Sequence, residues 1–367
     1  MMDIVQKDTT YAEINLSALQ HNIKILKQHA PQSKVVAIIK ANAYGHGMLK
    51  LAEQLQISQQ VHALGVARLG EALQLREAGI RLPIILLEGF FNNSDLPLLA
   101  EHQLQTVIHS QDQLQGLLNS DLTEKLTIWL KLDTGMHRLG FHPSEFNRTL
   151  EILKNTKKIQ QPVNFITHFN SADELDNPIT TPQIQLFKTQ TANQPGLCSL
   201  ANSAGVLAWP EAHADMIRPG IAMYGVSPFP DKSSNELQLK PVMTLKSHLI
   251  AVRQHSVGES VGYGASWTAQ ENTILGVIAV GYGDGYPRMA PAGTPILVNG
   301  RIVPIVGRVS MDMITVDLGI NSNDRVGDDV VLWGEGLPVE LVAKHIGTVA
   351  YELVTKLTVR VPLSYCE

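Results

Sequence analysis

Short apolar segments alternate with amphipathic stretches through the first two thirds of the chain, and this alternation constrains the fold more than any other feature. Segments that are apolar at nearly every position are typical of strands buried on both faces of a parallel sheet. Eight such segments begin near Lys34, His62, Leu82, Leu104, Leu126, Val163, Gly196 and His213. We therefore predict eight parallel strands in this part of the chain.

Helical patterns separate the apolar segments. One lies between Gly70 and Gly79, and another starts with Pro182 at a plausible first helical position. Eight strands alternating with helices over about 200 residues favour a (β/α)8 barrel of the TIM type. A doubly wound open sheet is the alternative, and it is weakened because no G-x-G-x-x-G motif opens a helix.

The pattern changes near Lys240. The stretch P-F-P-D-K-S-S-N-E (228–236) has the Pro- and Ser-rich composition of a linker, and Asn299-Gly300 stands between two apolar runs as a hairpin turn. Of the later segments only L-V-A-K-H-I-G-T-V-A-Y-E-L (341–353) resembles a helix. We expect an N-terminal segment (1–10) packed on a β domain, a barrel (11–239) and a mostly-β C-terminal domain (240–367).

Composition narrows the class of protein. The 367 residues carry a formal net charge of −5 and no cluster of Lys and Arg, which argues against nucleic acid as a partner. The two cysteines, Cys198 and Cys366, cannot form a disulfide framework. No apolar run approaches the length of a membrane helix, and the polar N-terminus is unlike a signal peptide. These features predict a cytoplasmic protein, and we expect no metal site.

Chemically active side chains stand where the predicted strands end. In barrel enzymes the carboxyl ends of the strands carry the catalytic residues. The strand ends here supply Lys40, Lys131, Arg138, His168, Asn202, Ser203 and Arg218.

Two loops near these ends have the composition of a phosphate site. A-N-S-A-G (201–205) follows the seventh strand and R-P-G-I (218–221) follows the eighth, where barrels commonly bind phosphate. Small residues let backbone N–H groups approach phosphate oxygens. A lysine at a strand end together with a phosphate site suggests pyridoxal 5'-phosphate bound covalently through Lys40. Taken singly, each loop is also compatible with an ordinary turn, and Lys40 with an exposed lysine.

The stretch V-V-A-I-I-K-A-N-A-Y-G-H-G (35–47) resembles the cofactor-lysine signature of bacterial alanine racemases. The resemblance covers nearly the whole chain and includes K-L-D-T-G-M-H-R-L-G (131–140), V-G-Y-G (261–264), G-Y-G-D-G-Y (281–286) and G-R-V-S-M-D (307–312). It implies a pyridoxal phosphate barrel followed by a β domain. It also implies a homodimer that interconverts L-alanine and D-alanine, the latter for peptidoglycan of the cell wall.

The resemblance also implies roles for single residues. Lys40 and Tyr263 would act as bases on opposite faces of the substrate, with Tyr263 supplied by the partner subunit. Arg218 would face the pyridine nitrogen, and Lys131 matches a lysine that is often carbamylated. The other residues implied to bind cofactor are Tyr44, Arg138, His168, Asn202, Ser203, Gly220, Ile221 and Tyr351. Those implied to face the substrate or its access channel are Arg138, Met311, Asp312 and Tyr282.

Racemisation removes a proton from one face of the α carbon and returns one to the other, so it needs two acid/base groups. A hydrogen-bonded chain from Tyr263 through His168 to Arg218 is one way to stabilise a phenolate. Because an arginine does not readily give up its proton, Arg218 would limit side reactions such as transamination.

Three other functions share parts of these patterns. A barrel-only pyridoxal phosphate carrier would lack the last 128 residues, which hold Tyr263 and Met311-Asp312. A basic-amino-acid decarboxylase would place an acidic residue where Arg218 stands. A broad-specificity or other small-amino-acid racemase remains open.

Overall fold

Eight parallel strands of the computed structural model, which describes residues 9–367, form one sheet in the order β8-β7-β6-β5-β4-β3-β2-β9. The last strand along the chain therefore pairs with the first, through Lys34 opposite Met216 and Val35 opposite Ile217. The strands are β2 (Lys34–Ile38), β3 (Ala63–Val66), β4 (Ile84–Leu86), β5 (Gln105–Ile108), β6 (Ile128–Lys131), β7 (Asn164–Ile166), β8 (Cys198–Ser199) and β9 (Met216–Ile217).

The sheet curls into a barrel whose seam lies between β8 and β9. The backbone N–H of Arg218 donates to the carbonyl oxygen of Ala201 at 2.8 Å, and the Ser199 hydroxyl donates to the carbonyl oxygen of Met216 at 2.7 Å. The predicted strands and the predicted barrel are confirmed. The doubly wound alternative is wrong, because that fold reverses its strand order part-way across the sheet.

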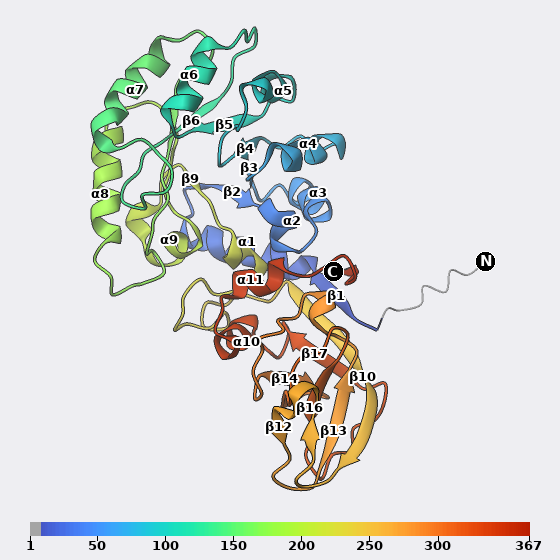
Figure 1. The fold of residues 1–367 in the computed structure, drawn as a ribbon. Helices are drawn as coiled ribbons and strands as arrows, with labels where there is room; N and C mark the ends of the chain where they lie inside the picture. Colours follow the sequence, from blue (N-terminus) through green and yellow to red (C-terminus); the bar gives the residue numbers. More distant parts are fainter. Residues whose placement is uncertain (1–8) are drawn as a thin grey trace, which may run out of the picture. The chain divides into compact units, whose positions relative to one another are not determined.

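Helices cover the outside of the strands (Figure 1). They are α1 (Leu16–His29), α3 (Met48–Ser58), α4 (Leu69–Glu77), α5 (Leu96–Glu101), α6 (Gln111–Asn119), α7 (Pro143–Asn155), α8 (Thr180–Thr191) and α9 (Ser203–Ala208). The short segment α2 (Lys40–Tyr44) follows β2 and has a left-handed backbone instead of a helical one. Two helices begin earlier than the sequence predicted, since Gly70 lies inside α4 and α8 begins two residues before Pro182. Both residues are tolerated there because the first turn of a helix has no internal partners for its N–H groups.

The barrel interior is a packed core. Inward-facing side chains from seven strands meet in it: Val36, Ile38, Ala63, Ile85, Val107, Trp129, Ile166 and Met216. The indole N–H of Trp129 donates to Gln105 Oε1 at 2.8 Å, so this large buried ring also satisfies its polar atom. The core therefore holds the strands rigidly and fixes where their carboxyl ends point.

A second sheet is mostly antiparallel and follows the order β15-β14-β17-β10-β1-β18, with β13 pairing with both β10 and β16. Its long central strand, β10, has 13 residues and joins β1, β13 and β17. Its strands are β1 (Tyr11–Asn15), β10 (Met243–His255), β13 (Thr273–Ile278), β14 (Pro295–Val298), β15 (Arg301–Pro304), β16 (Ile314–Asp317), β17 (Asp329–Trp333) and β18 (Leu363–Cys366). A separate two-stranded sheet consists of β11 (Ser260–Val261) and β12 (Trp267–Thr268).

The predicted hairpin is confirmed between β14 and β15. Asn299 and Gly300 both have positive φ, 47° and 77°, as the tight turn of type I′ requires. The helical stretch near the C-terminus is two helices rather than one, α10 (Val339–Ile346) and α11 (Ala350–Thr355). Gly347 adopts φ 81° and ends α10, because its left-handed backbone turns the chain away from the helix axis.

The chain divides into two compact units. The β unit comprises residues through Leu19, Tyr224–Ser227 and Ser233–Glu367, and the barrel unit comprises Gln20–Met223 and Pro228–Lys232. The predicted barrel start at residue 11 differs from this division, since β1 pairs with β10 and β18.

Of the predicted N-terminal segment (1–10), residues 1–8 lie outside the described residues. Thr10 belongs to the β unit, where its hydroxyl hydrogen-bonds that of Ser247 at 3.0 Å. Within residues 9–367 no helix is long and apolar enough to cross a membrane.

Candidate active site

The residues after β2 form a left-handed turn that starts at Lys40. Ala41, Asn42, Ala43 and Tyr44 have φ between 52° and 54°. A left-handed conformation costs about 1–2 kcal/mol for each residue that is not glycine. Four in succession are uncommon, and such strain persists only where surrounding contacts impose it.

Hydrogen bonds from outside and inside the turn impose this conformation. The Ala41 N–H donates to Glu71 Oε1 at 2.7 Å, and the Met48 N–H donates to Asn42 Oδ1 at 2.9 Å. The N–H groups of Gly45 and Gly47 donate to the carbonyls of Ala41 and Asn42, each at 3.0 Å. The sequence showed that the chain turns here, but it did not show the part played by Glu71.

His46 supports the turn from the interior. Its ring is fully buried, and burial lowers its pKa to about 4, so it is neutral at physiological pH. Its Nδ1 lies 2.9 Å from the Tyr44 carbonyl oxygen and 3.1 Å from that of Ala43. Both partners only accept hydrogen bonds, so Nδ1 carries the hydrogen. This function of His46 was not predicted from the sequence.

Tyr44, Ser203 and Gly220 come together beside the loops after β8 and β9. A Cβ atom at Gly220 would lie only 2.6 Å from the Tyr44 hydroxyl, so the close approach requires glycine. Burial raises the pKa of Tyr44 to about 12, which keeps its hydroxyl protonated and able to donate. Ser203 Oγ accepts the N–H groups of Gly220 at 2.9 Å and Ala222 at 3.2 Å. Its own hydrogen is then left to donate.

We call the group of Tyr44, Ser203 and Gly220 the cradle. Two more predicted residues lie beside it. Asn202 caps α9, where its Oδ1 accepts the Gly205 N–H at 2.9 Å. Ile221 is buried and follows directly on Gly220. The cap at Asn202 and the burial of Ile221 hold the ends of the two loops in place.

Arg218 is 5% exposed and lies at the carboxyl end of β9. Its guanidinium donates to Ser199 Oγ at 2.9 Å, to the Thr167 carbonyl at 2.5 Å and to the Leu200 carbonyl at 3.2 Å. Burial lowers its pKa to about 10, so it keeps its charge at neutral pH. Among the described residues Arg218 forms no hydrogen bond with the ring of His168; its guanidinium instead bonds Ser199 in β8 and the carbonyls of the residues that directly follow β7 and β8.

Positive charge gathers around Arg218. Burial lowers the pKa of Lys131 to about 8, and the charges of Arg218, Arg138 and Lys40 add to the effect. Burial and the same cations, with Lys131, hold the pKa of His168 well below its ordinary value. A neutral His168 among four cationic groups makes this end of the barrel suited to an anionic ligand.

The loop that carries Arg138 is organised by Asp133. Its Oδ1 accepts the N–H groups of Gly135 at 2.9 Å and His137 at 3.1 Å, and its Oδ2 lies 3.1 Å from His137 Nδ1. A Cβ atom at Gly140 would lie 2.7 Å from the Asp133 nitrogen, so the loop folds back tightly on itself. Arg138 itself is exposed on this loop.

In the β unit, Tyr282 and Met311-Asp312 lie on two adjoining segments. The Tyr282 N–H donates to the Ser310 carbonyl at 3.0 Å, and the Gly283 N–H donates to the Met311 carbonyl at 2.8 Å. A Cβ atom at Gly281 would lie 2.3 Å from that Met311 oxygen. Glycine at this position therefore lets the two predicted substrate segments pack against each other.

Arg360 ties these segments together and was missed by the sequence analysis. Its Nη2 donates to Asp312 Oδ1 at 2.8 Å, and its Nε lies 3.3 Å from Asp284 Oδ1. Asp284 Oδ2 in turn accepts the Gly281 N–H at 2.9 Å. We call this arrangement of Arg360, Asp284 and Asp312 the arginine clamp.

Tyr263 lies in the β unit on a short 3-10 turn, Tyr263–Ala265, and is 71% exposed. A small apolar cluster of Val261, Leu275 and Val306 anchors this turn beside Trp267. A Cβ atom at Gly264 would lie 3.5 Å from the Arg308 guanidinium, three residues before Met311.

Tyr351 is part of α11 and is 40% exposed. The predicted site residues thus fall into two sets. The barrel set holds Lys40, Tyr44, Lys131, Arg138, His168, Asn202, Ser203, Arg218, Gly220 and Ile221, and the β set holds Tyr263, Tyr282, Met311, Asp312 and Tyr351.

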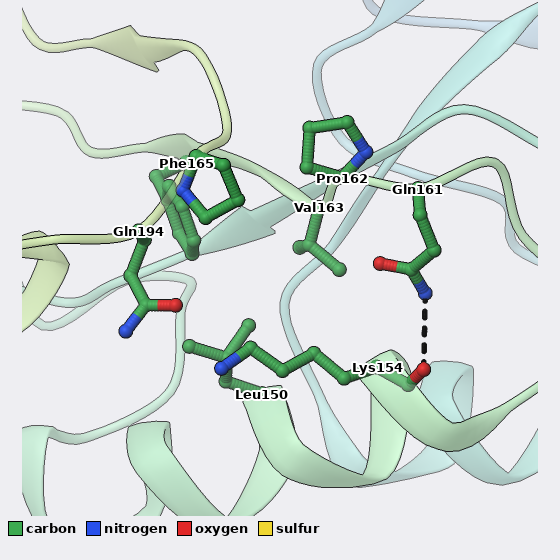
Figure 2. A pocket seen from close by; sticks show the side chains of 8 residues that line it. Leu150, Lys154, Gln161, Pro162, Val163, Phe165 and Gln194 are labelled. Atoms are coloured by element: carbon green, nitrogen blue, oxygen red, sulfur yellow. Dashed lines mark hydrogen bonds between the residues drawn. The ribbon is translucent and has the colours of Figure 1, made fainter.

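A pocket of about 450 Å³ lies at the opposite end of the barrel, beside the start of β7 (Figure 2). Its walls are mainly Leu150, Pro162, Val163 and Phe165. Gln161 Nε2 donates there to the Lys154 carbonyl at 3.3 Å. None of the predicted site residues lines this pocket.

Comparison with known proteins agrees with this geometry. The family model described as "Alanine racemase, N-terminal domain" matches residues 14–228, and "Alanine racemase, C-terminal domain" matches residues 242–365. The alanine racemase of Aeromonas hydrophila subsp. hydrophila is 57% identical over 354 residues, which cover 96% of this chain and 98% of the relative. That of Vibrio vulnificus (strain CMCP6) is 56% identical over the same shares.

Solved structures agree as well. The biosynthetic alanine racemase from Pseudomonas aeruginosa superposes with a TM-score of 0.95 at 44% identity, covering 98% of this chain and 99% of that one. The alanine racemase from Acinetobacter baumannii gives a TM-score of 0.90 at 38% identity over the same shares. With both domains matched in order along one chain, the protein belongs to the alanine racemase family.

Proposed function

We propose that this protein interconverts L-alanine and D-alanine with pyridoxal 5'-phosphate, using Lys40 and Tyr263 as its two bases. The observation that carries the proposal is the meeting of the Lys40 turn with the cradle of Tyr44, Ser203 and Gly220. A Cβ atom on Gly220 would lie 2.6 Å from the Tyr44 hydroxyl, and Tyr44 belongs to the same turn as Lys40. We therefore assign the lysine and the cradle to one site. Family membership supports the same activity.

The cradle fits a phosphate group. The protonated hydroxyls of Tyr44 and Ser203 are donors, and the absence of a side chain at Gly220 leaves room for an anion to approach the backbone. Lys40 stands at the end of β2, where its amino group can bind the cofactor covalently. When bound, pyridoxal phosphate supplies an electron sink that acidifies the hydrogen on the substrate's α carbon.

The chain must then handle a proton on each face of that carbon. Lys40 serves one face, and Tyr263 serves the other as a general acid/base. Tyr263 is 71% exposed on the β unit, as expected for a side chain that functions in another subunit. We therefore propose a homodimer in which Tyr263 of one subunit completes the site at Lys40 of the other.

Two arginines have different duties in this proposal. Arg218 stays protonated and held by Ser199 and two carbonyls, so it presents a fixed positive charge to the cofactor ring and accepts no proton. We assign Arg138, which is exposed on its loop, to the substrate carboxylate, because a planar guanidinium suits that pairing.

Lys131 orients Arg138 once it carries a carboxylate of its own. With a pKa of about 8, a fraction of its amine is neutral at physiological pH and can add CO2, releasing a proton and leaving a negative carbamate. Tyr282, Met311 and Asp312 line the substrate side and limit the substrate to a small side chain. D-alanine from this reaction would feed peptidoglycan synthesis.

The first test is a spectrum and a chiral assay on purified protein. We expect a visible absorption band after addition of pyridoxal phosphate, and conversion of pure L-alanine to a mixture of both enantiomers. Lys40→Ala should lose both. L-serine and L-lysine in parallel assays distinguish an alanine racemase from a broader one. Wild-type protein that shows no band and leaves L-alanine unchanged would overturn the proposal.

A further inference from the structure

The carboxylate of Glu71 joins two loops of the barrel unit. Glu71 lies in the first turn of α4, and its Oε2 accepts the N–H groups of Ala67 at 2.8 Å and Arg68 at 3.0 Å. Its Oε1 accepts the N–H of Ala41 at 2.7 Å, 30 residues away in sequence. Both oxygens are therefore occupied by backbone donors from the loops that follow β2 and β3.

The bonds to Ala67 and Arg68 are those of an ordinary helix start. A glutamate in the first turn commonly accepts the backbone N–H of the capping residue, and this alone explains the Arg68 contact. The bond to Ala41 has no such explanation. It reaches a different loop, and it reaches the first peptide after Lys40.

The position of Ala41 makes this bond consequential. Within the left-handed turn, the Ala43 N–H donates to the Ile39 carbonyl and the Gly45 N–H to the Ala41 carbonyl. The Ala41 N–H instead takes a charge-assisted bond to Glu71, and such bonds are stronger than neutral ones. Glu71 therefore fixes the peptide plane between Lys40 and Ala41, and with it the direction in which the Lys40 side chain leaves the backbone.

We propose that Glu71 is a positioning residue for Lys40, holding the strained turn in the one conformation that aims the lysine at the reacting carbon. This inference rests on the proposed function of Lys40. It predicts that the cost of losing Glu71 appears in the chemical step and not in substrate binding. A misplacement of about 1 Å at a reacting group costs on the order of 100-fold in rate.

The test compares three variants of the holoenzyme. Glu71→Ala removes both acceptor oxygens and with them all three hydrogen bonds, and Glu71→Gln keeps the shape but turns an NH2 group toward a backbone donor. Glu77→Gln, exposed at the other end of α4, is the matched control. For L-alanine we expect kcat to fall on the order of 100-fold in Glu71→Ala and on the order of tenfold in Glu71→Gln, with KM nearly unchanged. The control should match wild type.

A second readout separates positioning from stability. The visible circular dichroism of the bound cofactor reports its orientation on Lys40, and we expect it to change in both Glu71 variants and not in Glu77→Gln. If Glu71 only starts α4, the melting temperature will fall while kcat per folded molecule and the dichroism band stay as in wild type. That result would overturn the inference. Failure of the proposed function would look different, because Lys40→Ala would then racemise alanine as well as wild type.

Discussion

At the scale of single residues, Lys131 shows how burial changes a group's chemistry. It lies at the end of β6 among Arg218, Arg138 and Lys40, and its pKa falls from 10.5 to about 8. One pKa unit corresponds to about 1.4 kcal/mol, so keeping Lys131 charged costs the folded state on the order of 3 kcal/mol. The folded protein binds this proton less tightly than the unfolded chain does.

The sign of the pH dependence follows. Below about pH 8 both states are protonated and the full penalty applies, and between about pH 8 and 10.5 it is lost as pH rises. We predict that Lys131→Met is more stable than wild type at pH 7 in CO2-free buffer, and that the difference shrinks through this range. Urea unfolding at several pH values measures it.

Two controls accompany this measurement. Lys50→Met, at an exposed position paired with Glu53, should show a small difference that does not follow this pH range. Bicarbonate should stabilise wild type and leave Lys131→Met unaffected, since only the lysine can form a carbamate. A constant difference between Lys131→Met and wild type from pH 7 to 10.5 would contradict the assigned pKa.

Residue types were predictable from sequence, and close approaches were not. Lys40, Ser203 and Arg218 were recognised because the strand ends of a barrel are where such residues are used. Glu71 and His46 were not, since a glutamate on a helix and a histidine after a glycine have many ordinary uses. Only the folded chain shows that their polar atoms meet the backbone of the Lys40 turn.

At the scale of elements, the arginine clamp joins three segments that the sequence keeps apart. Arg360 precedes β18, Asp284 ends the short turn with Tyr282, and Asp312 precedes β16. The clamp holds Tyr282 and Met311-Asp312 in register, and these are the segments proposed to face the substrate.

We predict that Arg360→Met raises KM for alanine roughly fivefold with a smaller change in kcat, as expected for loss of two ion pairs of a half-exposed arginine. Arg301→Met is the matched control, because Arg301 also pairs with a carboxylate, Asp324, in the same unit but on the β14–β15 hairpin. Steady-state kinetics measures KM and kcat for both variants, and KM should rise only in Arg360→Met. Equal KM values in the two variants would show that the clamp does not position these segments.

At the scale of the whole molecule, the site residues are divided between two units and, in our proposal, between two subunits. Tyr263 and Met311 are 71% and 53% exposed in the single chain, which is unusual for large side chains that a function requires. A second copy of the chain would cover them and complete the site.

Mixed dimers test this sharing. Lys40→Ala and Tyr263→Phe proteins should each be inactive, and a heterodimer should contain one intact site. Random exchange at equal concentrations makes half of the dimers mixed, so we expect about a quarter of wild-type activity to return. Native mass spectrometry confirms that subunits have exchanged. Inactive mixtures with confirmed exchange would place both bases in one chain.

The sequence by itself determined the barrel and the β-rich remainder, and it predicted most of the residues that we propose for the site. Apolar runs, hairpin signals and motifs are local, and local patterns survive in a linear chain. The tertiary structure alone decided which strand joins which unit, as β1 shows by pairing with β10 and β18. It also decided the left-handed turn at Lys40 and the contacts of Glu71, His46 and Arg360. These depend on atoms distant in sequence that meet only when the core has packed.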